Sequence, residues 1–203
     1  MARKFVLSDV LRAAWKGLVS QIWLLAGLLI GYVIVSLSLI LFIPIPEQGS
    51  LSVAAIAIAL LGLGLSLLFS LGYTKNMFET LDGEEPQFSA YGQQSRKIIT
   101  GLIAGLIYTV IVTVGLALLV FPGIYLAIRL QFCYASIVEE DTGIVTSLKR
   151  SWEITKGQAM PLFLLLLVTI GFTVLGLAFF AIGVFVTFPL VGLIYCYTFR
   201  KLL

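Results

Sequence analysis

The sequence contains no histidine and only two cysteines, Cys133 and Cys196, in 203 residues. Histidine is the usual general base near neutral pH and the commonest metal ligand, so its absence argues against an enzyme and against a metal site. Both cysteines lie inside apolar runs, where reduced thiols pack as small apolar side chains. The sequence therefore predicts no disulfide framework, no cofactor and no catalytic activity.

Charged residues are also scarce, at 11% of the chain, whereas hydrophobic residues make up 60%. These proportions are far from those of soluble domains and are typical of a polytopic membrane protein. The 19 glycines fit this class, because small residues allow helices to approach closely in lipid. Two runs, GLLIG at 27–31 and GLIAG at 101–105, have the Gly-x-x-x-Gly spacing that supports such packing.

Six apolar blocks follow one another along the chain. Each is close to the ~20 residues with which an α-helix crosses a hydrocarbon core of ~30 Å, although the fourth and sixth blocks are short. We therefore predict an all-α fold, a helical bundle that forms one integral membrane domain over residues 1–203, with about six spans in three hairpins. The expected spans cover residues 22–43, 51–72, 98–121, 123–138, 160–182 and 184–199.

The basic residues indicate the orientation of these hairpins. Twelve of the thirteen lysines and arginines lie before, between or after the hairpins, and none lies in the hairpin turns. By the positive-inside rule, both termini and the two long connections are expected in the cytoplasm. Trp15, Trp23 and Trp152 lie at the same boundary, where an indole ring prefers the headgroup layer, so we expect them to be interfacial anchors.

The segment before the first span is repeated before the fifth. SDVLRAAWKGLVSQIWLL and VTSLKRSWEITKGQAMPLFLL align Trp15 with Trp152 and Gln21 with Gln158, and a fainter copy, FSAYGQQSRKIITGL, precedes the third span. Apolar residues recur at helical spacing in these segments, beside basic residues. We expect interfacial helices that lie on the inner leaflet, the second ending at Gly157; the alternative is a plain solvated connection.

Arg129, the thirteenth basic residue, lies inside the fourth block. Helical spacing places Tyr125, Arg129 and Ser136 on one face, together with Cys133 and Glu140. A charge near the bilayer centre costs at least ~2.5–3.5 kcal/mol, so this arginine is expected to face the bundle interior, a wet cavity or a partner. Its donors either join neighbouring helices or bind an anion such as a lipid phosphate, and the sequence leaves both roles open.

Two acidic clusters lie on the predicted cytoplasmic side. Carboxylates in such clusters bind hard cations in some proteins, but here we expect solvated loop charges that balance nearby lysines and arginines. The clusters comprise Glu79, Asp82, Glu84 and Glu85, and Glu139, Glu140 and Asp141.

The runs PGIYLAIRL, SIVEEDTG and SLKRSWEITKGQ resemble a pattern in a broad group of bacterial polytopic membrane proteins, which includes the membrane domain fused to some glycerophosphodiester phosphodiesterases. The resemblance implies a bacterial membrane protein. In the fused members the chemistry lies in a separate soluble domain, for which this chain has no room after its six spans, so we expect no phosphodiesterase activity. The positions that mark the pattern are Pro122, Gly123, Arg129, Glu139, Ser151, Trp152 and Gly157.

These observations predict a non-catalytic accessory or scaffold protein of the bacterial cytoplasmic membrane. Its expected partners are membrane lipids and either another membrane protein or a second copy, with no nucleic acid. The alternative is a transporter or permease for a small or lipid-like anionic substrate, because internal repeats and broken apolar segments are pointers to such proteins.

Overall fold

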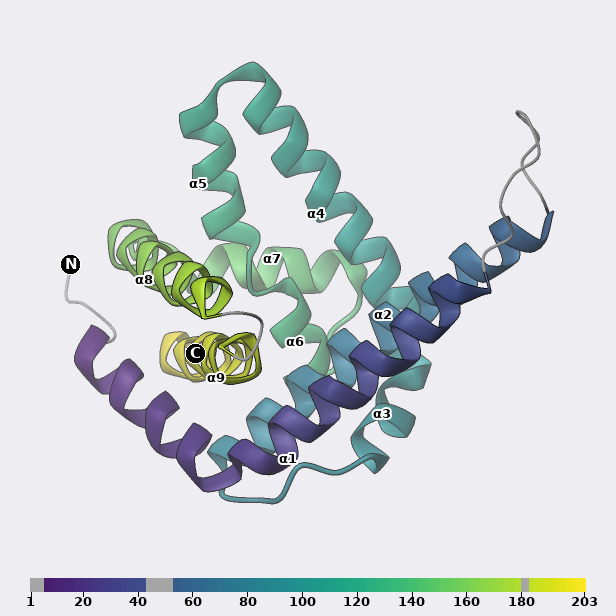
Figure 1. Ribbon diagram of the computed structural model, residues 1–203. Helices are drawn as coiled ribbons and strands as arrows, with labels where there is room; N and C mark the ends of the chain where they lie inside the picture. The colour runs from purple at the N-terminus through teal and green to yellow at the C-terminus, as the bar shows by residue number, and fades with distance from the viewer. Residues whose placement is uncertain (1–5, 43–52, 180–182) are drawn as a thin grey trace.

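The computed structural model describes residues 6–42, 53–179 and 183–203, and in these ranges the chain is helical without strands (Figure 1). The predicted all-α fold is therefore confirmed. The helices are α1 (Leu7–Leu41), α2 (Val53–Leu81), α3 (Ser89–Gln94), α4 (Ile98–Leu118), α5 (Val120–Leu130), α6 (Cys133–Glu139), α7 (Ile144–Ile154), α8 (Ala159–Ala178) and α9 (Val184–Leu202), with a 3-10 turn at Ser95–Lys97.

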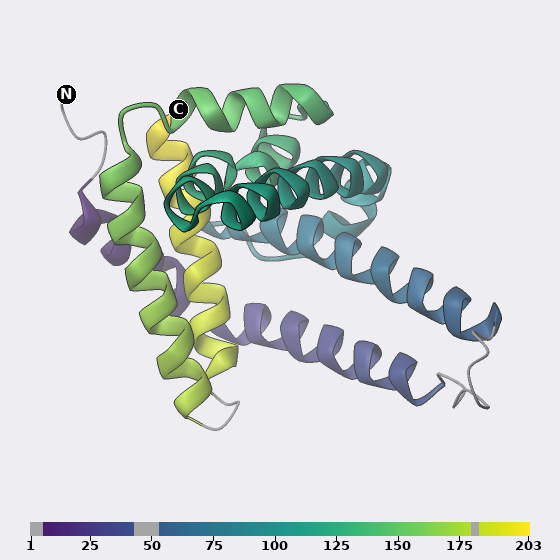
Figure 2. The same ribbon diagram turned by 90° about the horizontal axis from the view of Figure 1, so that it is seen from above.

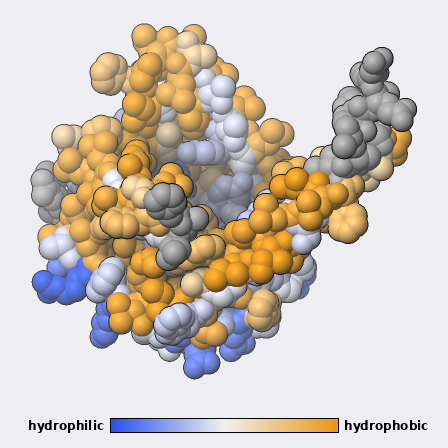
Figure 3. Space-filling view, in the orientation of Figure 1, coloured by the Kyte–Doolittle hydropathy of each residue, from blue (hydrophilic) through white to orange (hydrophobic). Residues whose placement is uncertain are grey.

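The long helices pair into three hairpins, α1–α2, α4–α5 and α8–α9, which diverge from a shared region (Figures 1 and 2). We call this region the hub; it consists of residues 7–20 of α1, the ends of α2 and α9, and α3, α6 and α7. Figure 3 shows apolar surface over the hairpins and hydrophilic residues along the lower edge of the molecule. The charges thus gather at one end of the hairpins, as the basic residues predicted.

Five helical segments of the described chain are long and apolar enough to cross a membrane: Leu7–Leu41, Val53–Leu81, Ser89–Leu118, Val120–Glu139 and Ala159–Ala178. The protein is therefore membrane-embedded. The sixth expected block forms α9, which is not among the five and which packs against α1, α2 and α8 as part of the core. Residues 43, 51–52 and 180–182 of the expected spans, and the connection 44–50, lie outside the described residues.

The repeat seen in the sequence is also a repeat of backbone conformation. Gln21 leaves the helical region at φ −131° and ψ 19°, and its counterpart Gln158 does so at φ −112° and ψ 16°. Lys97, just before α4, has φ −96° and ψ 1°. Each hairpin is thus preceded by a helix and a break. The helix before the third hairpin, α7, ends at Ile154 and not at Gly157 as we had expected; Gly157 lies in the turn that follows, at φ 78°.

Only one of the two Gly-x-x-x-Gly runs packs against another helix of the described chain. A Cβ on Gly105 would overlap the hydroxyl of Tyr134, so α4 approaches α6 more closely than any larger residue allows. Gly27 and Gly31, in contrast, have no neighbour within 4 Å of such a Cβ. These two glycines line an apolar groove of about 230 Å³ together with residues of α2 and α3, among them Phe69 and Tyr91.

Candidate functional site

Arg129 lies in the last turn of α5 and is 3% exposed. Its guanidinium carbon is 4.2 Å from the centroid of the Trp152 ring, on α7, and 5.9 Å from that of Tyr125, one turn earlier on α5. The two rings meet edge to face, with centroids 6.1 Å apart. We call these three residues the Arg129 cage, and its main attraction is the cation–π contact with the indole.

The cage lies where α5 meets the hub. The hairpin tip lies at the start of α5, and Arg129 lies at the opposite end, where α5 meets α7 (Figure 1). Arg129 is thus next to the predicted interfacial helix, and it is the tenth of the twenty residues of the candidate span Val120–Glu139. Its place in the last turn also puts the positive charge at the negative end of the helix dipole, which is stabilising.

The guanidinium has no hydrogen-bond or ion-pair partner among the described residues, and Nε is buried without one. An N–H group that is buried without an acceptor is costly, because water no longer solvates it, and this applies to Nε of Arg129. Among the described residues Arg129 therefore joins α5 to α7 through the Trp152 ring and not through hydrogen bonds, and both predicted roles of the arginine stay predictions.

The fourth expected span, 123–138, is interrupted. α5 ends at Leu130 and α6 begins at Cys133, so residues 131–132 break the helix. The expectation that Ser136 shares a face with Arg129 is therefore wrong. The Ser136 hydroxyl instead donates to Glu140 Oε2 at 3.1 Å and lies 2.9 Å from the Thr142 hydroxyl.

Hydroxyl groups from α7 satisfy the backbone freed at this break. Ser151 Oγ donates to the carbonyl of Arg129 at 2.8 Å and accepts the backbone N–H of Phe132 at 3.1 Å. Thr155 Oγ1 donates to the same carbonyl at 3.1 Å. Both hydroxyl-bearing residues are fully buried. Irregular backbone in a membrane protein requires such partners, and these two side chains supply them.

Tyr195 on α9 is the third side chain that forms hydrogen bonds with the backbone at the helix break. Its hydroxyl donates to the carbonyl of Gln131 at 2.9 Å and accepts the N–H of Ala135 at 3.2 Å. The break is thus held from two sides, by α7 and by α9. Sequence reasoning missed Thr155 and Tyr195 entirely, because a hydroxyl inside a helix carries no local signal that it reaches a distant carbonyl.

We had expected the acidic clusters to be solvated loop charges, but several of their carboxylates form hydrogen bonds with arginines. Arg200 at the end of α9 donates from Nη2 to Asp82 Oδ2 at 2.8 Å and from Nε to Glu139 Oε1 at 2.9 Å. Arg150 donates to both carboxylate oxygens of Glu140. Arg200 therefore joins the ends of α2, α6 and α9. We count α6 with the α4–α5 hairpin that it follows, so these helices come from three different hairpin units. The hydrogen bonds from Arg200 lower the pKa of Asp82.

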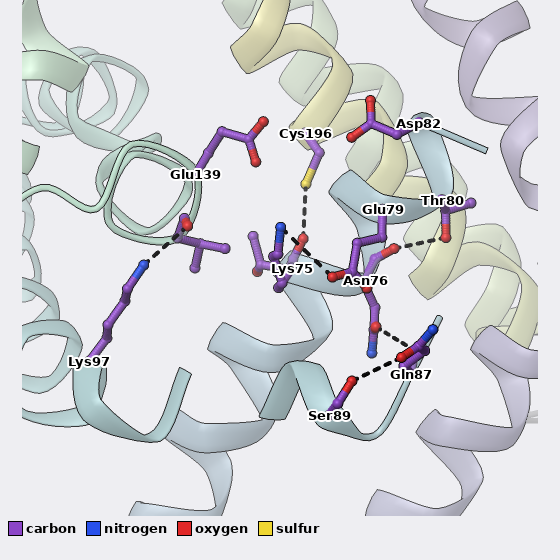
Figure 4. Close-up of polar contacts among 12 residues, drawn as sticks. Lys75, Asn76, Glu79, Thr80, Asp82, Gln87, Ser89, Lys97, Glu139 and Cys196 are labelled. Carbon is purple, nitrogen blue, oxygen red and sulfur yellow. Dashed lines mark hydrogen bonds and ion pairs between the residues drawn. The ribbon is translucent and has the colours of Figure 1, made fainter. Parts of the chain in front are cut away.

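Lys97 closes the end of α6. Its Nζ donates to the carbonyls of Ile137 at 3.0 Å and Val138 at 3.3 Å, and Figure 4 shows Lys97 reaching this end of α6. The same Nζ pairs with Asp141 at 2.7 Å. This ion pair lowers the pKa of Asp141. Asp141 has φ 55°, a left-handed conformation that favours glycine at the end of a helix. The lysine thus stabilises a turn that an aspartate alone disfavours.

A cleft of about 700 Å³ opens beside Lys97. Arg96, Glu139 and Asp141 also line it, and Figure 4 shows Lys75, Lys97 and Glu139 around this region. Its carboxylates are already paired with Arg200 and Lys97, so the lining offers no free acid pair for a cation. No group of three or more histidine, cysteine or acidic residues in the described chain is arranged to hold a metal ion.

Comparison with known proteins places part of the chain in a family. The family described as a domain of unknown function, DUF7847, matches residues 93–200, which is more than half of the chain. No curated protein and no solved structure matches. The matched range runs from the end of α3 to Arg200 and so includes the Arg129 cage, the helix break and most of the charged hub.

Proposed function

Because the chain belongs to the DUF7847 family, whose description assigns no function, we propose its function from its own residues: a non-catalytic scaffold of the bacterial cytoplasmic membrane that binds anionic lipids at its hub. The scaffold would hold a membrane partner or a second copy of the chain. One structural observation supports lipid binding at the hub.

That observation is the imbalance of unpaired charge at the hub. Most acids of the two clusters are paired with Lys75, Lys97, Arg150 or Arg200, so they do not neutralise the remaining cations. Besides Arg129, six basic residues have no ion pair among the described residues: Arg12, Lys16, Arg96, Lys149, Lys156 and Lys201. They outnumber the acids without an ion pair, which are Asp9, Glu84, Glu85 and Glu153. A cation close to an anionic leaflet gains about 1 kcal/mol, so the hub favours such a surface.

The first half of α1 supplies the geometry for lipid contact. Val10, Ala14 and Leu18 are fully buried in the hub, which leaves the opposite face of this segment outside. Trp15 on that segment is 56% exposed, and Trp23 just after the break is 89% exposed. Exposed indoles beside Arg12 and Lys16 are the composition of an interfacial helix.

Other parts of the proposal have weaker support. The cytoplasmic orientation of the hub follows from the positive-inside rule, and bacterial origin from the motif resemblance to the phosphodiesterase-linked membrane domains. The absence of histidine supports a protein without catalysis. The groove beside Gly27 and Gly31, which has space for added side chains, is compatible with a partner helix.

Quenching of tryptophan fluorescence by brominated lipids tests the lipid part. The protein is reconstituted into vesicles that contain brominated phosphatidylglycerol or brominated phosphatidylcholine at the same mole fraction. We expect stronger quenching by the anionic lipid, and loss of that preference in Arg12→Gln/Lys16→Gln. The charge-preserving control Arg12→Lys/Lys16→Arg should keep it. Equal quenching by both lipids in the unmodified protein would refute the proposal.

A transporter is the second candidate, favoured by the helix break at residues 131–132. Discontinuous helices often form substrate sites in transporters. A cavity of about 210 Å³ lies beside this break and is lined by Gln131, Thr169 and Tyr195 among apolar residues. If proteoliposomes that contain the protein take up an anion, and Arg129→Gln abolishes this uptake, the protein is a transporter and the scaffold proposal is refuted.

A further inference from the structure

We propose that the Arg129 cage binds the phosphate group of a lipid headgroup. The inference deepens the proposed function, on which it rests for the presence of lipid at the hub, and it names a defined site in place of a charged surface. The ligand chemistry is a phosphodiester that accepts hydrogen bonds from a guanidinium.

The first argument is the unfilled hydrogen-bonding capacity of Arg129. A guanidinium has five N–H donors in one plane and no acceptor. At 3% exposure Arg129 is almost removed from solvent, yet the described chain gives these donors no acceptor. The carbonyl of Arg129 itself is occupied by the hydroxyls of Ser151 and Thr155. An external acceptor would complete the site.

The second argument is that the contacts already present do not replace that acceptor. The Trp152 ring interacts with the positive charge of the guanidinium, and the end of α5 adds the helix dipole. The guanidinium forms no hydrogen bond with a carbonyl at this end of α5, and Nε has no partner among the described residues, so its donors stay free for an oxyanion. Arginine is suited to this task because its planar fork binds two phosphate oxygens together.

The third argument is the absence of a competing carboxylate on the following helix. Glu139 is held by Arg200 and Glu140 by Arg150, so both are engaged at the far end of α6. Among the described residues, no acid forms an ion pair with Arg129. The phosphate would thus meet a cation that the fold leaves without a counter-ion.

The surroundings favour a lipid over a free phosphate ion. Tyr125 is 47% exposed and Trp152 is 38% exposed, so the cage opens onto the outer surface of a membrane-embedded protein. Trp152 belongs to α7 at the hub, where an amphipathic indole marks the headgroup layer. A lipid that lies against these rings would bring its phosphate to the level of the guanidinium.

The test follows the fluorescence of Trp152 alone. A Trp15→Phe/Trp23→Phe protein in a neutral detergent is titrated with dihexanoyl-phosphatidylglycerol, with inorganic phosphate, and with dihexanoylglycerol, which lacks the phosphate. We expect a saturable change with the phospholipid and none with dihexanoylglycerol. Arg129→Gln should weaken binding about tenfold or more, as expected for a lost charge-assisted hydrogen bond.

Two controls separate this inference from its alternatives. Arg12→Gln/Lys16→Gln in the same background should bind the short-chain lipid unchanged, even where it loses the vesicle preference described above. If Arg129→Gln does not fold, the Trp15→Phe/Trp23→Phe protein still tests the proposal. If its Trp152 fluorescence does not change when the phospholipid is added, the proposal is overturned. An equal response to inorganic phosphate would overturn the lipid assignment, and undiminished binding by folded Arg129→Gln would overturn the site.

Discussion

Replacing Arg200 by glutamine is expected to loosen the hub. The arginine contacts carboxylates from two other hairpin units, Asp82 and Glu139, and lies 5.0 Å from the ring centroid of Phe78. Its side chain is 28% exposed, between a surface pair, worth about 0.2–1 kcal/mol, and a buried pair, whose disruption costs about 3–5 kcal/mol. We therefore expect a loss of about 2 kcal/mol, or about 4–8 °C in Tm for a chain of this size.

Thermal unfolding in detergent, followed by tryptophan fluorescence, measures this loss. The matched control is Lys201→Gln. Lys201 is exposed, forms no ion pair among the described residues and lies 5.4 Å from the centroid of the Tyr197 ring, so the loss of stability should stay within about 0.5 kcal/mol. Asp82→Asn in the Arg200→Gln background should cost less than in the unmodified protein, since the interaction is already absent. If Arg200→Gln unfolds at the same temperature as Lys201→Gln, the network does not hold the three units together.

Three further changes test other features of the fold. Ser151→Ala removes a donor and an acceptor from the helix break and should cost about 1–3 kcal/mol in thermal unfolding; no loss would show that the break does not depend on it. Gly72→Ala should destabilise the protein, because its Cβ would overlap the Tyr91 ring, whereas Gly27→Ala, which meets no neighbour within 4 Å, should be neutral; equal Tm values would contradict this packing. The pKa of Asp82 is lowered from 3.8 by Arg200, so its stabilisation is complete above that pH and is lost as the pH falls through the folded-state pKa. Asp82→Asn should therefore lose less stability than the unmodified protein between about pH 4 and pH 2, and parallel acid curves would refute the assignment.

The parts of the fold that local patterns determine were predictable from the sequence. Apolar block length indicated the helices, and the alignment of Gln21 with Gln158 indicated two equivalent segments; that the backbone leaves the helical region at both residues became known only from the structure. The interruption at residues 131–132 was not predictable, because neither glycine nor proline lies there. Its partners come from residues 19 to 64 positions away in sequence.

The same limit applies to the candidate site. Tyr125 was correctly grouped with Arg129, because they are one helical turn apart on α5. Trp152 was predicted only as an interfacial anchor, since its contact with Arg129 depends on how α7 packs against α5. The pairing of Arg200 with Asp82 spans 118 positions, and no spacing rule connects residues that far apart.

The position of Arg200 in the chain also orders events during synthesis. A ribosome that adds about 5–20 residues per second reaches Arg200 on the order of ten seconds after Asp82, since 118 residues separate them. The first two hairpins therefore enter the membrane while Asp82 and Glu139 still await their counter-ion. Both carboxylates stay hydrated in this interval, so nascent intermediates keep these helix ends in water until the last helix arrives.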